Sequence, residues 1–113
     1  MVLAMLDCSV GELFVYASCF SQKRMKPVSM AAQKMASLLK LNFEIKTFRK
    51  NFTPIYVYYK TGDEEPIPIY CSNDGQSRMD EVYEVLRNMM FVLSFHPKHG
   101  ALRRVRKEIM QFS

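Results

Sequence analysis

FEIKTFRKNFTPIYVYYKTGDEEPIPIYC, residues 43–71, is the stretch that decides the fold. Its β-branched, aromatic and other apolar residues form three strand-like runs at 43–50, 55–60 and 67–71. Pro54 separates the first two runs, and the turn-forming segment 61–66 separates the last two. We therefore expect a three-stranded antiparallel meander. Prolines at 66 and 68 cannot donate ladder hydrogen bonds, so the third run belongs at an edge of the sheet or turns its proline nitrogens away from a neighbouring strand.

The segments before this stretch predict one further strand and a helix. Residues 12–20 are rich in aromatic and β-branched residues, which favours a strand, and the basic, proline-containing segment 22–27 then reads as a loop. A helix is expected over about residues 29–41, because Ala31, Met35, Leu38 and Leu39 recur at helical spacing. Two alternatives stay open, namely an all-helical N-terminal third and a β-bulge near Thr47 in the first central strand.

A long amphipathic helix is the clearest local prediction after the strands. It carries apolar residues at steps of three and four, at Met79, Val82, Tyr83, Leu86, Met89, Met90 and Leu93. Asp74 or Ser77 is expected to cap its N-terminus, and the segment 96–100, HPKHG, to end it. Leu102, Val105 and Ile109 then predict a shorter last helix.

The resulting order is β-α-β-β-β-α-α, which is typical of an α+β fold. We expect a small antiparallel sheet of three or four strands with the helices packed on one face, in two layers. At 113 residues and 49% hydrophobic composition, the chain, residues 1–113, fits a single domain with one small core.

Composition also restricts where the protein works. No apolar run approaches the length of a membrane-spanning helix, so we expect no membrane association. Cys8, Cys19 and Cys71 are an odd number at wide spacing, which favours free thiols in the cytoplasm or the nucleus.

Charge is divided into blocks along the chain. The formal net charge of +5 is what remains of +6 over residues 1–62, −6 over 63–84 and +5 over 85–113. A modest positive charge favours anionic partners, and segregated charge can match a second copy of the chain or a partner with the inverse pattern. Ordinary solvated faces are the simpler interpretation, because exposed ion pairs add little stability.

Residues for catalysis or metal binding are scarce. A nucleophilic triad needs a histidine beside its nucleophile, and the two histidines, His96 and His99, share one predicted turn. A structural zinc site needs four ligands, and no pair of cysteines is present to complete one with these two histidines. The chain also lacks a glycine-rich phosphate loop. We therefore expect a protein that is not an enzyme and that uses no cofactor, metal or small-molecule substrate.

A nucleic-acid surface is the second functional hypothesis. If Ile55, Val57 and Tyr59 point into the core, their neighbours in the strand share the other face of the sheet. Aromatic rings interleaved with lysines suit stacking on bases and pairing with phosphates. The expected residues are Lys46, Phe48, Lys50, Tyr56, Tyr58, Lys60 and Tyr70, extended by Arg103, Arg104, Arg106 and Lys107 of the last helix. The element order resembles that of several small RNA-binding modules, although no motif accompanies it.

Protein association is the hypothesis that the sequence favours most. The run MMFVLSF, residues 89–95, is apolar almost all round, and a domain of this size has little structure with which to cover it. An adaptor-like interface to a protein partner or to a second copy in a dimer is expected at Met89, Met90, Phe91, Val92 and Phe95. The alternative is a central core helix. Edge pairing through the first strand or the proline-marked strand would offer another route to a partner.

Overall fold

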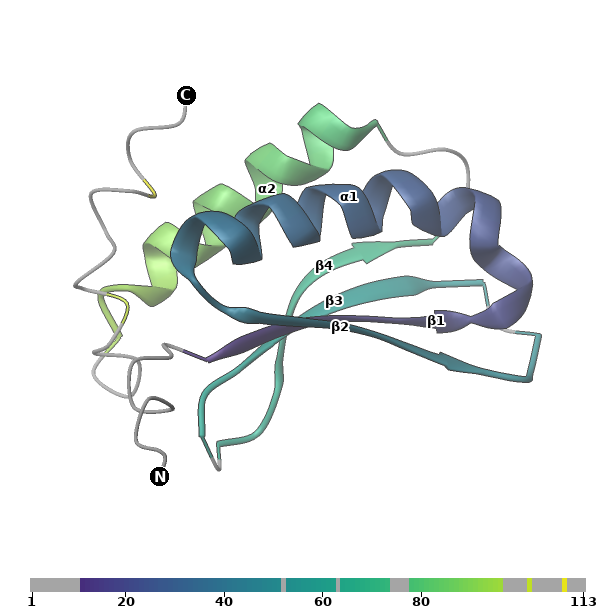
Figure 1. Cartoon of the computed structure of the whole chain (residues 1–113), viewed down its shortest axis with the longest axis horizontal. Coiled ribbons are helices and arrows are strands. Elements are labelled where there is room, and N and C mark those ends of the chain that lie inside the picture. Colours follow the sequence, from purple (N-terminus) through teal and green to yellow (C-terminus); the bar gives the residue numbers. More distant parts are fainter. Residues whose placement is uncertain are drawn as a thin grey trace.

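The computed structural model describes residues 11–51, 53–62, 64–73, 78–96, 102 and 109. These form a four-stranded mixed sheet with two helices packed on one side of it, as Figure 1 shows. The elements follow the order β1 (Glu12–Ser18), the 3₁₀ turn η2 (Cys19–Ser21), α1 (Gln22–Leu39), β2 (Asn42–Phe48), β3 (Ile55–Lys60), β4 (Ile67–Ser72) and α2 (Met79–Leu93). The predicted two-layer α+β architecture is confirmed.

Strand order corrects the expected meander. The sheet runs β2-β1-β3-β4, so β1 lies between the first two strands of the stretch 43–71. β1 pairs parallel with β2 and antiparallel with β3, which makes the sheet mixed rather than wholly antiparallel. The reason is α1, because a helix connecting two neighbouring strands crosses over the sheet and returns the chain in the same direction. β4 is an edge strand, which is one of the two placements that its prolines allowed.

Helix α1 begins earlier than the sequence indicated. The basic segment 22–27 forms its first turns, and Pro27 lies inside the helix. Proline removes one backbone hydrogen bond and favours a bend. The hydroxyl of Ser29 donates to the carbonyl of Met25 at 2.6 Å, a contact that also bends helices. In Figure 1 the first turns of α1 accordingly descend toward the end of β1 at an angle to the rest of the helix.

The end of α1 is fixed by a backbone motif. Lys40 adopts a left-handed conformation with φ 59°, and its amide donates to the carbonyl of Ser37. The next amide, that of Leu41, donates to the carbonyl of Ala36 at 2.8 Å. This pair of bonds is the Schellman arrangement, which satisfies the last carbonyls and reverses the chain into β2.

A β-bulge interrupts the pairing of β3 with β4. The register shifts between Val57 and Tyr58, so that Val57 pairs with Tyr70 while Tyr58 pairs with Pro68. Ile69 is the extra residue of β4 and is buried. The alternative of a bulge near Thr47 is excluded, because β2 pairs with β1 without interruption over residues 42–48.

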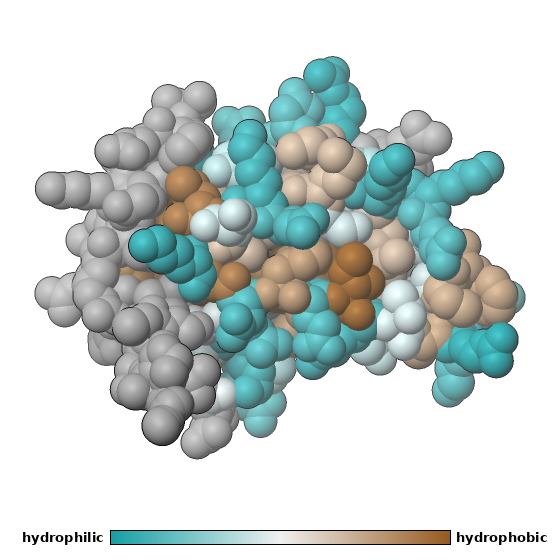
Figure 2. Space-filling view, in the orientation of Figure 1, coloured by the Kyte–Doolittle hydropathy of each residue, from teal (hydrophilic) through white to brown (hydrophobic). Residues whose placement is uncertain are grey.

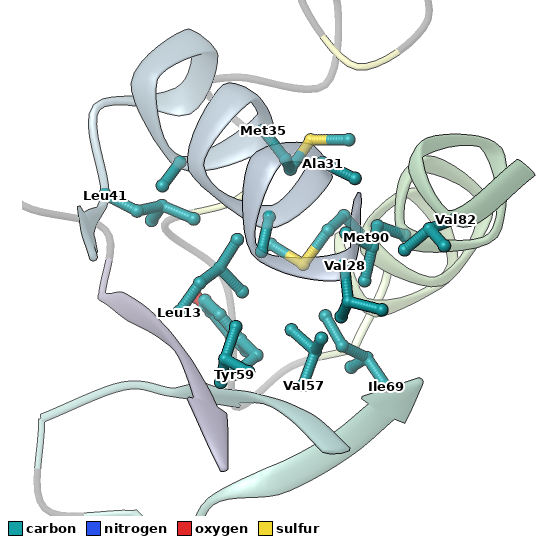
Figure 3. Close-up of a cluster of buried hydrophobic side chains, with 14 of the residues drawn as sticks. Leu13, Val28, Ala31, Met35, Leu41, Val57, Tyr59, Ile69, Val82 and Met90 are labelled. Carbon is teal, nitrogen blue, oxygen red and sulfur yellow. The ribbon is translucent and has the colours of Figure 1, made fainter. Parts of the chain in front are cut away.

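The core lies between the sheet and the two helices. Leu13, Val57, Tyr59 and Ile69 point from the strands toward α1 and α2, as Figure 3 shows. The helices contribute the buried side chains Met25, Val28, Ala31, Ala32, Met35, Ala36, Leu39, Val82, Leu86 and Met90. Leu102 and Ile109 are also buried. Val105 and the rest of the predicted last helix lie outside the described residues, as do Cys8 and the proposed caps Asp74 and Ser77.

Candidate binding surfaces

The side of the sheet that faces away from the helices carries a cluster of aromatic rings. Burial alternates along β3, with Ile55, Val57 and Tyr59 buried on the helix side, so the predicted two faces of this strand are confirmed. The opposite side presents five rings from three strands, and we call them the aromatic face: Phe14, Tyr16, Phe48, Tyr56 and Tyr58. Within the described part of the chain, both helices lie on the other side (Figure 1).

The five rings touch one another in an unbroken series. Phe48 stacks on Tyr16 with 4.8 Å between ring centroids, and Tyr16 meets Tyr58 edge to face at 6.4 Å. Tyr58 in turn stacks on Phe14 at 5.1 Å and lies 5.7 Å from Tyr56. Offset stacking and edge-to-face contact are the favourable aromatic geometries, so the rings hold one another in place across the sheet.

Lysines and glutamates surround these rings in comparable number. The ammonium of Lys46 lies 4.1 Å from the centroid of Phe14, within the range of a cation–π contact. That of Lys60 donates to the carbonyl of Gly62 at 2.6 Å. Glu44 pairs with Phe14 in the ladder, and Glu12 pairs with Lys60, which puts two carboxylates on the same side of the sheet. The local charge of the aromatic face is therefore close to balanced.

Contacts between the rings leave few ring faces open. Phe14 is only 6% exposed, because Tyr58 covers it on one side and Lys46 approaches it on the other. Tyr16 is the most exposed of the five rings, at 38%. Part of the surface of each ring is therefore covered by a neighbouring ring.

Tyr56 is electrostatically linked to the edge strand. Cys71 of β4 lies across the ladder from it. The pKa of Tyr56 is raised, first by the negative charge that the Cys71 thiolate would carry, then by burial and by a side-chain hydrogen bond to Cys71. A neutral phenol therefore stands at this end of the aromatic face at physiological pH.

Most of the described residues predicted for a nucleic-acid surface do share this side. Lys46, Phe48, Tyr56, Tyr58 and Lys60 lie there as expected. Lys50 is exposed just after β2, where its carbonyl accepts from the hydroxyl of Ser18 at 2.5 Å. Arg103, Arg104, Arg106 and Lys107 lie outside the described residues.

Tyr70 is a correction to that prediction. It pairs with core-facing Val57 and packs against the hydrophobic core, so it belongs to the helix side. The bulge at Ile69 is the cause, because one extra residue in β4 exchanges the faces of the residues that follow it. Sequence reasoning also missed Phe14 and Tyr16, although their spacing of two within 12–18 is the signal that places both on one side of a strand.

The apolar residues predicted as a protein interface separate into two groups. Met90 is fully buried in the core, and Met89 and Phe91 are half-buried against it. Val92 and Phe95 are 62% and 58% exposed, and Phe95 meets Phe91 edge to face at 5.1 Å. The core-helix alternative thus accounts for Met90, while the exposed pair remains available at the C-terminal end of α2.

Two hollows lie on the described surface. One, of about 600 Å³, lies at the start of α1 and is lined by residues 19–24, Asn51 and Thr53, with the Arg24 guanidinium donating to the carbonyl of Thr53 at 2.8 Å. The other, of about 350 Å³, lies between the helices, where the Lys34 ammonium stands 4.7 Å from the Tyr83 ring. Among the described residues, no three histidines, cysteines or acidic residues gather as metal ligands would. His96 is exposed after α2, and His99 lies outside the described residues.

Comparison of the chain with protein families, with curated proteins and with solved structures gives no match in any of the three. The helices of the described region are all too short or too polar to cross a membrane.

Proposed function

We propose that this chain is a non-enzymatic binding module that associates with a protein partner through its aromatic face. The observation that carries the proposal is the unbroken contact of five rings on the side of the sheet away from α1 and α2. Tyrosine is enriched at protein interfaces, since its ring supplies apolar contact at low entropic cost and its hydroxyl supplies a hydrogen bond. Rings already held by their neighbours lose little freedom when a partner binds.

A protein partner suits this surface better than a nucleic acid. Base stacking needs open ring faces, whereas these rings are largely stacked on each other. A phosphate backbone needs an excess of positive charge, whereas Glu12 and Glu44 offset Lys60 and Lys46 here. The free thiols of Cys19 and Cys71 support a reducing compartment, and we propose the cytoplasm or the nucleus.

Site-specific photo-crosslinking in cells tests the proposal. A benzophenone side chain in place of Tyr56 keeps an aromatic ring on the sheet, and the same group at Gln33, exposed on α1, is the matched control. We expect discrete adducts at position 56 that protease removes and nuclease does not. Adding Tyr16→Ser should reduce them. If position 56 gives no more adduct than position 33, the aromatic face is not a binding surface.

Single-stranded RNA or DNA is the second candidate, and the position of Lys46 over Phe14 favours it. In this case the adducts at position 56 would be sensitive to nuclease. Binding to an oligouridine would weaken steeply between low and moderate salt, and Tyr56→Ala with Tyr58→Ala would reduce it several-fold or more. Absence of binding at low salt would exclude this candidate.

A further inference from the structure

The two edges of the sheet are built differently. Pro66 directly precedes β4 and Pro68 is its second residue, and the strand also contains a bulge and packs against α2. These are the features by which proteins protect an edge from pairing. β2, the other edge, is seven residues long, contains no proline and keeps regular register throughout. No other strand of the described region pairs with its outer side.

β2 is also the most exposed strand of the sheet. None of its residues is buried, and Ile45 is 44% exposed although it points to the helix side. Figure 2 shows apolar surface between α1 and β2 on the side toward the viewer, bordered by hydrophilic side chains. An apolar residue on a regular, unpaired edge is a feature that favours pairing with another strand.

The charges along β2 would meet opposite charges in an antiparallel pairing with a second copy of the same strand. Glu44 and Lys46 flank Ile45, and both point to the side of the aromatic face. If two copies of β2 pair antiparallel about a two-fold axis at Ile45, each Glu44 lies across from Lys46 of the other copy. Opposite charges directly across a ladder are stabilising.

Only this register pairs the full length of β2 and also places opposite charges across from each other. Centring the axis on Ile45 pairs all seven residues, Asn42–Phe48, because Ile45 is the middle of the strand. Moving the axis to Glu44 would oppose two glutamates, and moving it to Lys46 would oppose two lysines. Intermediate positions would join the helix side of one copy to the aromatic face of the other.

We propose that the chain forms a two-fold symmetric dimer by antiparallel pairing of β2 with β2 of a second copy, centred on Ile45. The four-stranded sheets then join into one, with both aromatic faces on the same side and both pairs of helices on the other. The inference goes beyond the proposed function, since it concerns a strand edge, and the dimer and the aromatic face can each fail without the other.

Charge reversal tests the pairing by sedimentation equilibrium over a range of concentrations. The wild type is expected to dimerise. In the Lys46→Glu variant two glutamates would lie across from each other, and in the Glu44→Lys variant two lysines would. Each variant should weaken self-association by about tenfold or more. The double variant Glu44→Lys/Lys46→Glu should restore it, and so should an equimolar mixture of the two single variants, as a heterodimer. Glu65→Lys, on the β3–β4 loop, is the control and should leave the dimer intact. A wild type that stays monomeric, or a mixture that associates no better than the single variants, overturns the proposal.

A disulfide provides a second measurement. In a chain whose native cysteines are replaced by serine, Ile45→Cys should oxidise to a covalent dimer, because facing residues of antiparallel strands have Cα atoms within reach of a disulfide. Thr47→Cys is the matched control, because its counterpart would lie roughly 13 Å away along the ladder. Equal cross-linking at both positions would contradict the register, and none at position 45 would contradict the dimer.

Discussion

Gly11 occupies a position that no other residue can take without strain. Its φ of +134° is unfavourable for L residues, and a Cβ built there would stand 2.5 Å from the carbonyl oxygen of Lys60 and 3.0 Å from the Tyr59 ring. The carbonyl of Gly11 accepts from the amide of Asn42 at 3.1 Å, so the residue also sets the start of the β1–β2 pairing.

We expect Gly11→Ala to lower the free energy of unfolding by roughly 3 kcal/mol, from backbone strain and from the displaced carbonyl. Gly62→Ala is the matched control. Its φ is +51° with open space around it, so the cost should be about 1 kcal/mol. Urea unfolding of both variants measures the difference, and equal costs would mean that the contact with Lys60 relaxes freely.

Individual residue positions were predictable only where the strands alternate regularly. The two faces of β3 follow from IYVYYK, because Ile55 and Val57 alternate with Tyr56, Tyr58 and Lys60 at a period of two, and Tyr59 continues the buried series. Tyr70 could not be placed in this way, since a bulge caused by one residue leaves no mark in composition. Met90 was placed by its helical spacing but could not be assigned to core or surface, since its neighbours Met89 and Phe91 are equally apolar.

At the scale of elements, the C-terminal end of α2 carries a core residue and an exposed apolar residue two positions apart. Met90 is fully buried, whereas Val92, two residues later, is 62% exposed. We expect Met90→Lys to cost more than about 4 kcal/mol, because it buries an unpaired charge, and the chain should lose its cooperative fold. Val92→Lys should change stability by no more than about 0.5 kcal/mol.

Circular dichroism with thermal unfolding checks both variants. A folded Met90→Lys chain would show that the core around α2 is far looser than its burial indicates. Because Val92→Lys retains the fold, its effect on any partner binding can be read without interference from unfolding.

One contrast in the sequence separates a central strand from an edge strand. Residues 12–18 read ELFVYAS, nearly continuously apolar, as expected of a central strand between two neighbours. Residues 42–48 read NFEIKTF, interrupted by charges, as expected of an edge. The short connection between β2 and β3 suggested a hairpin instead, because consecutive strands usually pair. Pairing between strands distant in sequence leaves no local signal, which is why the parallel β1–β2 contact was not foreseen.

At the scale of the whole molecule, the acidic block of the sequence is divided in space. Glu64 and Glu65 lie on the β3–β4 loop, whereas Asp80 and Glu81 lie in the first turn of α2. Figure 1 places these two sites at opposite ends of β4. Among the described residues, charge that is contiguous in sequence therefore lies in two separate places on the molecule.

The stability of the whole fold should decline in alkaline solution because of Tyr59. Its side chain is fully buried, and burial raises its pKa above the ordinary value of 10, with a hydrogen bond to Thr61 acting in the opposite direction. Above about pH 10 the unfolded chain releases this proton while the folded chain retains it, so the unfolded state gains stability as pH rises. The contribution is fully present below that pH.

Tyr59→Phe removes the titrating group and keeps the ring in the core. Urea unfolding between neutral pH and pH 11 should show a steeper alkaline decline for the wild type than for the variant, apart from a constant offset for the lost Thr61 bond. Parallel curves would mean that Tyr59 ionises as easily in the folded chain as in the unfolded one.

The central position of β1 has a consequence for synthesis on the ribosome. β1, α1 and β2 are consecutive in the chain and can pair as soon as residue 48 has emerged. The other side of β1 then waits for β3, which ends at Lys60. During that interval the nascent chain presents an apolar strand with one open side, so the pace of translation through residues 49–60 governs how long a chaperone or a neighbouring nascent chain can reach it.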